Sequence, residues 1–189
     1  MYLIRAEYMF ESEEALDLSG LVILYTGDGK GKTTAAFGLA MRAAGHGKRI
    51  CIIQFMKRCG ECGEVKAVKK FDTITLRQFG TGMFVVKGKH KKEDTEEAAR
   101  GMVFASEALT SGLYDLVILD EICIAVDFGL IDVDDVLELL KKRNPGVDVV
   151  LTGRNAPEAL IDVADLVTEM KAVKHPYDDG MGAREGIEY

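Results

Sequence analysis

Residues 21–34 constrain the possible folds of this chain more than any other segment. They read Leu-Val-Ile-Leu-Tyr-Thr-Gly-Asp-Gly-Lys-Gly-Lys-Thr-Thr, and an alanine-rich stretch follows them. The apolar start is typical of a buried parallel strand, and the alanine-rich stretch predicts a helix. A strand that runs into a glycine-rich turn, Gly-Lys-Thr and a helix is the setting of a phosphate-binding P-loop. A turn that binds nothing is the weaker alternative, because such a turn needs neither the lysine nor the threonine.

Each residue type in this loop has a physical role in holding phosphate. Glycines let the backbone turn tightly, so that successive N–H groups face phosphate oxygens, and the N-terminus of the next helix favours anions. Lys32 is expected to reach the terminal phosphates, and the Thr33 hydroxyl to help hold Mg²⁺. The first glycine comes one position later than in the usual G-x-x-x-x-G-K-[ST] spacing, where Thr26 stands. The ATP-binding residues predicted here are Gly27, Asp28, Gly29, Lys30, Gly31, Lys32, Thr33 and Thr34.

A second chemical feature ends another apolar strand. Residues 114–121 read Tyr-Asp-Leu-Val-Ile-Leu-Asp-Glu, which is the Walker B arrangement of P-loop proteins. Asp120 is predicted to orient hydrated Mg²⁺, and Glu121 to contact the metal, the ribose or a water. Carboxylates that merely end a strand are the alternative. Arg154 follows a predicted strand at the edge where ligands gather in open α/β sheets, so it is predicted either to face the triphosphate or the substrate, or to form a structural salt bridge.

The order of the other elements indicates the fold class. Further strands are predicted at residues 49–55, 73–79, 147–151 and 166–173, and helices at 33–44, 94–112 and from Asp132 onwards. Strands that alternate with helices imply an α/β fold, here a P-loop NTPase-like three-layer sandwich with a mostly parallel sheet of about six strands. The strand order stays open. Helix ends are assigned to Gly45, Gly112 and Asp132, a capping box to Asp94 and Glu97, and a short helix to the caps Asn155 and Glu158.

No linker divides the sequence, so residues 1–189 are predicted to form a single domain. Residues 1–19 are predicted to be an N-terminal arm or a lid near the site, with a solvated tail as the alternative. Residues 174–189 are predicted to form an irregular C-terminal tail, in which His175 is more typical of a structural than a catalytic histidine.

Charge and hydropathy exclude several classes of function. The net charge of −7 argues against general binding to nucleic acid or to an anionic membrane. No apolar run approaches the roughly 20 residues of a membrane span. Charged residues near the start, where a signal peptide needs an apolar core, favour a cytoplasmic location.

The chain has four cysteines, which a cytoplasmic location predicts to be reduced thiols. Cys51 is predicted to be a small core residue. Cys59 and Cys62 have the spacing of half a zinc site or of a redox pair. A plain loop is favoured over metal, because no second pair is present in the sequence.

Residues 80–92 combine apolar and basic side chains in a glycine-bounded segment. Met83 and Phe84 have no periodic reason to be there, so they are predicted to belong either to the core or to a hydrophobic substrate surface. The Lys/His cluster at 87–92 is predicted to be solvated, with guidance of an anionic ligand as the alternative.

Several blocks of sequence, in the right order, resemble the family of P-loop ATP:corrinoid adenosyltransferases, which act on cob(I)alamin and cob(I)yrinic acid a,c-diamide. The resemblance covers about residues 20–189, and its blocks are 25–36, 45–55, 114–121, 151–157 and the tail at 167–189. In one place the chain departs from the family. Members often carry Gly-Thr-Gly-Phe-x-Trp, whereas here Gly-Thr-Gly is followed by Met83, Phe84 and Val85, and the chain has no tryptophan.

The resemblance implies transfer of the 5′-deoxyadenosyl group of ATP to the cobalt(I) of a reduced corrinoid, with release of triphosphate. It implies catalytic roles for Lys32, Thr33 and Glu121, with Mg²⁺ held by Thr33, Asp120 and Glu121. The implied corrinoid contacts are Phe79, Met83 and Phe84. It also implies a homodimer and a flavoprotein or other low-potential electron donor. A kinase or ATPase that cleaves the γ-phosphate, and a non-catalytic carrier, are the alternatives.

Overall fold

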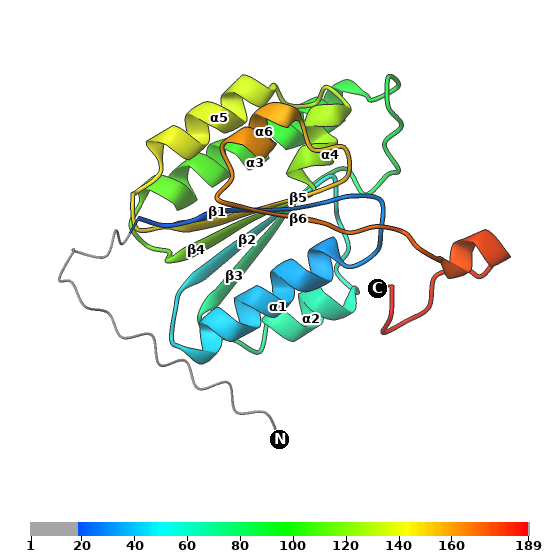
Figure 1. Cartoon of the computed structure of the whole chain (residues 1–189), viewed down its shortest axis with the longest axis horizontal. Coiled ribbons are helices and arrows are strands. Elements are labelled where there is room, and N and C mark those ends of the chain that lie inside the picture. The colour runs from blue at the N-terminus through cyan, green and yellow to red at the C-terminus, as the bar shows by residue number, and fades with distance from the viewer. Residues whose placement is uncertain (1–18, 189) are drawn as a thin grey trace.

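The computed structural model describes residues 19–188 of the chain. At its centre is a six-stranded sheet in the order β3-β2-β4-β5-β1-β6, in which every pair of neighbouring strands is parallel. Helices cover both faces of this sheet (Figure 1). The predicted three-layer α/β architecture is therefore confirmed. The predicted arm or lid at the N-terminus lies outside the described residues, except for its last position.

The strands are β1 (Val22–Thr26), β2 (Ile50–Phe55), β3 (Ile74–Phe79), β4 (Leu116–Asp120), β5 (Asp148–Thr152) and β6 (Leu166–Glu169). The helices are α1 (Lys32–Gly45), α2 (Gly63–Val68), α3 (Lys92–Thr110), α4 (Ile122–Asp127), α5 (Val133–Lys142) and α6 (Glu158–Asp162), with a 3₁₀ turn η1 (Pro176–Asp179). Helices α1 and α2 lie on one face of the sheet, and α3 to α6 lie on the other (Figure 1). Among the described residues no helix is long and apolar enough to cross a membrane.

Continuous apolar sequence explains why the central strands are covered on both sides. Every residue of β2 and of β4 is buried, as a parallel sheet between two helical layers requires. The alanines of α1 pack on one face with Ile50 and Ile52, while α3 and α5 pack on the other with Cys51 and Ile53. Strand β6 differs, because all its residues are exposed at the sheet edge.

The parallel arrangement places the carboxyl ends of the strands along one edge. The register pairs Gln54 with Asp120, so the ends of β2 and β4 coincide. Strand β5 lies between β4 and β1, so that Thr152 separates Asp120 from the strand that precedes the glycine-rich loop. The chemistry-bearing residues therefore meet at the edge where open α/β sheets bind ligands.

Some of the predicted element ends were wrong. Helix α1 continues through Gly45, and Gly47 takes the left-handed conformation instead, with φ 71°. Helix α3 begins before Asp94, whose Oδ2 accepts the Lys91 backbone N–H at 2.9 Å from within the first turn. Asn155 does not cap α6, which Pro157 precedes. The Asp132 cap is confirmed, because its Oδ1 accepts the backbone N–H of Asp134, at 3.0 Å.

Candidate nucleotide and metal site

The glycine-rich loop between β1 and α1 is held from outside by the chain that leaves β6. The Gly29 N–H donates to the Met170 carbonyl at 2.6 Å. A Cβ added at Gly27 or Gly29 would lie 2.5 or 2.7 Å from that same oxygen. Gly27 and Gly31 also have positive φ angles, 94° and 122°. Glycine is therefore required here by a close backbone approach as well as by the turn.

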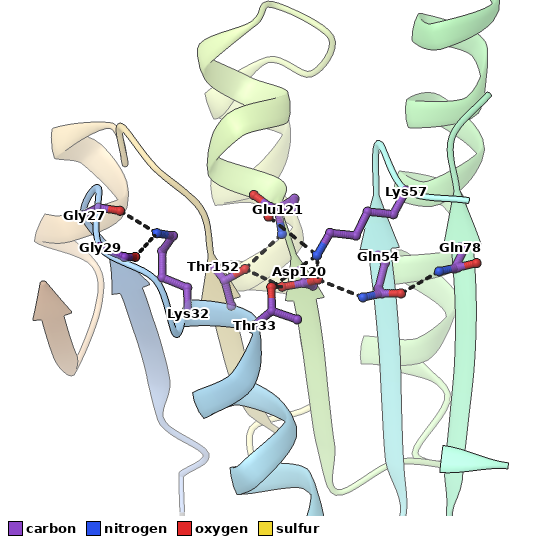
Figure 2. A network of polar contacts seen from close by, with 10 residues as sticks. All are labelled: Gly27, Gly29, Lys32, Thr33, Gln54, Lys57, Gln78, Asp120, Glu121 and Thr152. Atoms are coloured by element: carbon purple, nitrogen blue, oxygen red, sulfur yellow. Dashed lines mark hydrogen bonds and ion pairs between the residues drawn. The ribbon is translucent and has the colours of Figure 1, made fainter. Parts of the chain in front are cut away.

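Lys32 lies folded back over this loop. Its ammonium donates to the carbonyl oxygens of Gly27 and Gly29, at 2.6 and 2.7 Å (Figure 2). Burial lowers the pKa of Lys32, and the positive charge of Arg154 lowers it further, although Glu121 opposes both. Among residues 19–188, the hydrogen-bond partners of the Lys32 ammonium are these two carbonyl oxygens, which an arriving phosphate would replace.

Asp120 is the centre of the polar network. It is fully buried at the end of β4, and each of its two carboxylate oxygens accepts two hydrogen bonds (Figure 2). Oδ1 accepts from the hydroxyls of Thr33, at 2.9 Å, and Thr152, at 2.7 Å. Oδ2 accepts from Gln54 Nε2, at 3.0 Å, and Lys57 Nζ, at 2.8 Å. These four partners fix the orientation of the carboxylate, beside the threonine predicted to bind metal.

The network extends outward across β2 and β3. Gln78 Nε2 donates to Gln54 Oε1 at 2.8 Å, and the Cys59 N–H donates to Gln78 Oε1 at 3.0 Å. Each amide thereby has a defined orientation, because its oxygen accepts and its nitrogen donates within one chain of hydrogen bonds. Neither glutamine was predicted to take part in the site.

Glu121 has an unusual backbone and an unpaired oxygen. Its φ of 64° is left-handed, a conformation that non-glycine residues seldom adopt. Its N–H donates to Thr152 Oγ1 at 3.0 Å. Its Oε2 is buried and has no hydrogen-bond partner among the described residues. Burial raises the pKa of Glu121, and Asp120 adds to this effect while Lys57 opposes it.

Lys57 is the principal site residue that sequence reasoning missed. It follows β2, and its ammonium lies 2.8 Å from Asp120, 3.2 Å from Thr33 and 3.6 Å from Glu121 (Figure 2). Burial lowers the pKa of Lys57, but the charges of Asp120 and Glu121 outweigh burial and raise it overall. Its place just after a central strand, at the edge where ligands gather, was the available signal.

A cavity of about 310 Å³ opens at the loop. Residues 29–34 line it together with Glu121, Ile124, Arg154 and His175. Most of the predicted loop residues are thus brought together with Glu121 and Arg154, whereas Gly27, Asp28 and Asp120 are not among the lining residues. His175, predicted to be structural, also faces this cavity, and its Nδ1 accepts the Tyr177 N–H at 3.2 Å.

The three predicted corrinoid contacts lie in two different surroundings. Phe79 packs in the core against Phe104, with ring centroids 5.8 Å apart. Met83 and Phe84 are 68% and 92% exposed, on a loop that follows β3. They line a shallow groove of about 290 Å³ with residues 85 and 86.

The loop of Met83 and Phe84 is attached at both of its ends. Thr81 Oγ1 donates to Asp94 Oδ1 at 2.8 Å, which ties the loop to the start of α3. Lys87 Nζ donates to Asp127 Oδ1 at 2.7 Å, at the end of α4. Lys87, a member of the basic cluster, is thus paired while its side chain stays 61% exposed, in agreement with the predicted solvated run.

The prediction of reduced thiols is wrong for Cys59 and Cys62, which form a disulfide. Their Cα atoms are 5.6 Å apart, within the range that a disulfide spans without backbone movement. Cys51 and Cys123 are free and buried, as expected of core cysteines. Within residues 19–188, no three side chains of His, Cys, Asp or Glu converge in a way that could hold a metal.

Several known proteins with similar sequences are corrinoid adenosyltransferases. The family model described as "ATP:corrinoid adenosyltransferase BtuR/CobO/CobP" matches residues 18–189. A corrinoid adenosyltransferase of Sinorhizobium sp. is 40% identical over 176 residues, covering 92% of this chain and 82% of that protein. The corrinoid adenosyltransferase of Escherichia coli K12 is 35% identical, over 93% of this chain and 89% of that protein. That of Pseudomonas aeruginosa is 34% identical, over 93% and 87%.

Proposed function

Because the chain belongs to the ATP:corrinoid adenosyltransferase family, we propose that the cavity at residues 29–34 holds the triphosphate of ATP while the adenosyl group is transferred. The chain is an enzyme that adenosylates corrinoids with ATP. The observation that carries the proposal is that Lys32, Thr33 and Glu121 line one cavity at the carboxyl edge of the sheet.

The proposed step is attack of the corrinoid's cobalt(I) on C5′ of ATP, with triphosphate as the leaving group. Cobalt(I) supplies the electron pair of the new cobalt–carbon bond and carries no proton, so no general base is needed. The protein has to hold C5′ in line between cobalt and the leaving oxygen. It also has to neutralise the charge that grows on the triphosphate, for which Lys32 and the N–H groups of the loop are suited. Lys32 would exchange its two carbonyl partners for phosphate oxygens.

The residues at the end of β4 fit a magnesium ion. Mg²⁺ prefers oxygen ligands and is usually held by one or two carboxylates together with substrate phosphates and waters. The Thr33 hydroxyl, Asp120 and the unpaired Oε2 of Glu121 are oxygen donors in one place. When bound, the ion would neutralise charge on the leaving triphosphate. These three residues would hold the ion, and hydrogen bonds from Gln54 and Thr152 would keep Asp120 in position.

Met83 and Phe84 are proposed to contact the corrinoid ring. They are exposed apolar side chains on a loop attached to Asp127, and α4 connects that residue with Glu121. An apolar wall at this position would exclude water and oxidants from cobalt(I). Phe79, which is partly buried and packs against the core, would support the loop rather than touch the ring.

The purified protein tests this assignment directly. Given ATP, Mg²⁺ and chemically reduced cobalamin, it should yield a light-sensitive cobalt–carbon product and tripolyphosphate in equal amounts. ADP as the main nucleotide product would contradict the proposed step and revive γ-phosphate cleavage, which the relatives do not favour. AMP as the main product would also contradict the proposed step. A single stoichiometric burst without a steady rate would instead indicate a carrier.

The finer properties of the family are carried over as proposals. We propose a cytoplasmic homodimer supplied with electrons by a flavoprotein or another low-potential donor. Light scattering should give twice the 20.7 kDa of one chain. Chemically reduced flavin, supplied in place of the stronger reductant, should sustain turnover in the absence of oxygen.

A further inference from the structure

One ammonium group lies among the three residues assigned to the metal. Lys57 Nζ donates to Asp120 Oδ2 at 2.8 Å and to Thr33 Oγ1 at 3.2 Å, and it lies 3.6 Å from Glu121 Oε1. These oxygens come from α1, from the end of β4 and from the turn into α4 (Figure 2). Lys32, by contrast, is turned towards the loop carbonyls. The cation at the centre of the site is therefore Lys57, and not the lysine of the P-loop.

The backbone around Lys57 is shaped to bring it there. Met56, the residue before it, is left-handed with a φ of 57°, which is uncommon for a side chain of this type. Gly80 packs against this bend, where an added Cβ would lie 2.7 Å from the backbone nitrogen of Lys57. A left-handed methionine and a contact that only glycine permits thus redirect the chain as it leaves β2. The fold therefore fixes the backbone position from which the Lys57 side chain reaches the carboxylates.

The charges explain why a cation is needed there. Asp120 is fully buried, and the side chain of Glu121 is only 22% exposed, so two carboxylates lie side by side with little water to screen them. Two neighbouring negative charges that water does not screen repel each other strongly. The single charge of Lys57 offsets one of them and leaves the pair with a net negative charge. A doubly charged ion at the same oxygens would offset both.

Lys57 and a magnesium ion would not share this position. Mg²⁺ binds oxygen at about 2.0–2.1 Å, so an ion on the Thr33 hydroxyl would lie close to an ammonium that is itself 3.2 Å from that oxygen. Two cations so close repel one another. Entry of the metal therefore requires the ammonium to withdraw, and the long side chain of lysine allows such a movement while its charge stays near the triphosphate.

We propose that the Lys57 ammonium occupies the magnesium site in place of the metal until Mg²⁺ binds. This inference depends on the magnesium site that is part of the proposed function. Its ammonium holds Thr33, Asp120 and Glu121 together in the nucleotide-free enzyme. When Mg²⁺ arrives with ATP, the ammonium leaves the carboxylates and contacts the triphosphate. Lys57 is thus both a gate against free Mg²⁺ and a second neutralising charge for the leaving group.

Binding of Mg²⁺ alone to the nucleotide-free protein, measured by calorimetry, tests the gate without turnover. Lys57→Met removes the charge and keeps most of the side-chain volume, so the variant should bind Mg²⁺ about tenfold or more tightly than wild type. Lys57→Arg keeps the charge and should restore weak binding. Lys66→Met is the control, because Lys66 is exposed on α2 and pairs with Glu61, so its loss should leave Mg²⁺ binding unchanged. Equal or weaker Mg²⁺ binding by Lys57→Met would overturn the proposal.

Wild-type protein provides a second measurement, independent of whether Lys57→Met folds. A crystal structure with Mg²⁺ and ATP, but no corrinoid, should show the metal on Thr33 and Lys57 Nζ moved from Asp120 to a phosphate oxygen. A metal on Thr33 with Lys57 still bonded to Asp120 would refute the exchange and leave the proposed function intact. A bound ATP with the metal elsewhere would refute the magnesium site itself.

Discussion

Lys32 and Lys57 enter the site from different elements and bond to different groups. Lys32 begins α1, and within the described part of the chain its ammonium bonds to two backbone carbonyls of the preceding loop. Lys57 follows β2 and bonds to side chains that come from α1 and β4. Removing the first should therefore affect the phosphates alone, whereas removing the second leaves two carboxylates uncompensated. The two lysines can be separated by experiment.

Lys32→Ala should lower the rate of adenosylation by about 100-fold or more, because a charge that stabilises the leaving group is lost. The thermal midpoint should stay close to that of wild type, since the two carbonyl oxygens released can bond to water. Anaerobic formation of the cobalt–carbon product measures the rate of adenosylation, and circular dichroism measures the thermal midpoint. Lys66→Ala is the matched control. Loss of folding in Lys32→Ala would mean that the lysine is structural.

The cysteines give a prediction at the same scale. Burial raises the pKa of the Cys51 and Cys123 thiols to about 12, so the native protein should react very slowly with alkylating reagents at neutral pH. After denaturation without reductant two thiols should be labelled, and after reduction all four. Mass spectrometry counts the labels. Four labelled thiols before reduction would show that Cys59 and Cys62 are not joined.

At the scale of the elements, the accuracy of the sequence predictions depended on how local their causes were. The strands were predictable because runs of valine, leucine and isoleucine form buried strands whichever strand lies beside them. The P-loop was predictable because its glycines, lysine and threonine are consecutive. The hydrogen bonds of Gln54 and Lys57 to Asp120 were not predictable, because Asp120 lies 66 and 63 positions away and the strand order was unknown. The left-handed Met56 and Glu121 left no sequence signal, since neither residue type favours that conformation.

Two helical glycines test how closely the elements pack. A Cβ at Gly101 of α3 would lie 2.6 Å from the Phe55 ring in the sheet, so Gly101→Ala should destabilise the fold by about 1–3 kcal/mol. At Gly38 of α1, no neighbouring atom of the described residues lies within 4 Å of an added Cβ, so Gly38→Ala should stabilise by about 0.5–1 kcal/mol. Urea unfolding of both variants measures the difference. Equal effects would show that α3 can move away from the sheet.

At the scale of the whole molecule, the two edges of the sheet have different tasks. The carboxyl edge gathers strained backbone, buried charge and an unpaired oxygen, all of which cost stability. The opposite edge carries a pairing that contributes stability. There Arg49, before β2, and Asp115, before β4, form a two-pronged ion pair, and the Asp115 carboxylate also accepts the Arg49 backbone N–H at 2.8 Å.

This pairing predicts a particular dependence of stability on acid. The side chain of Arg49, then its backbone N–H, lower the pKa of Asp115 from 3.8 to about 2. A lowered carboxyl pKa adds stability that is fully present above the unfolded value, and that stability is lost as the pH falls through about 2. Asp115→Asn should therefore be less stable than wild type at pH 7, by an amount that begins to shrink below about pH 4. Urea midpoints of the two proteins from pH 7 to pH 2.5 measure this difference. A gap that stays constant over the whole range would show that the asparagine disturbs backbone packing, and that the charge of Asp115 contributes nothing.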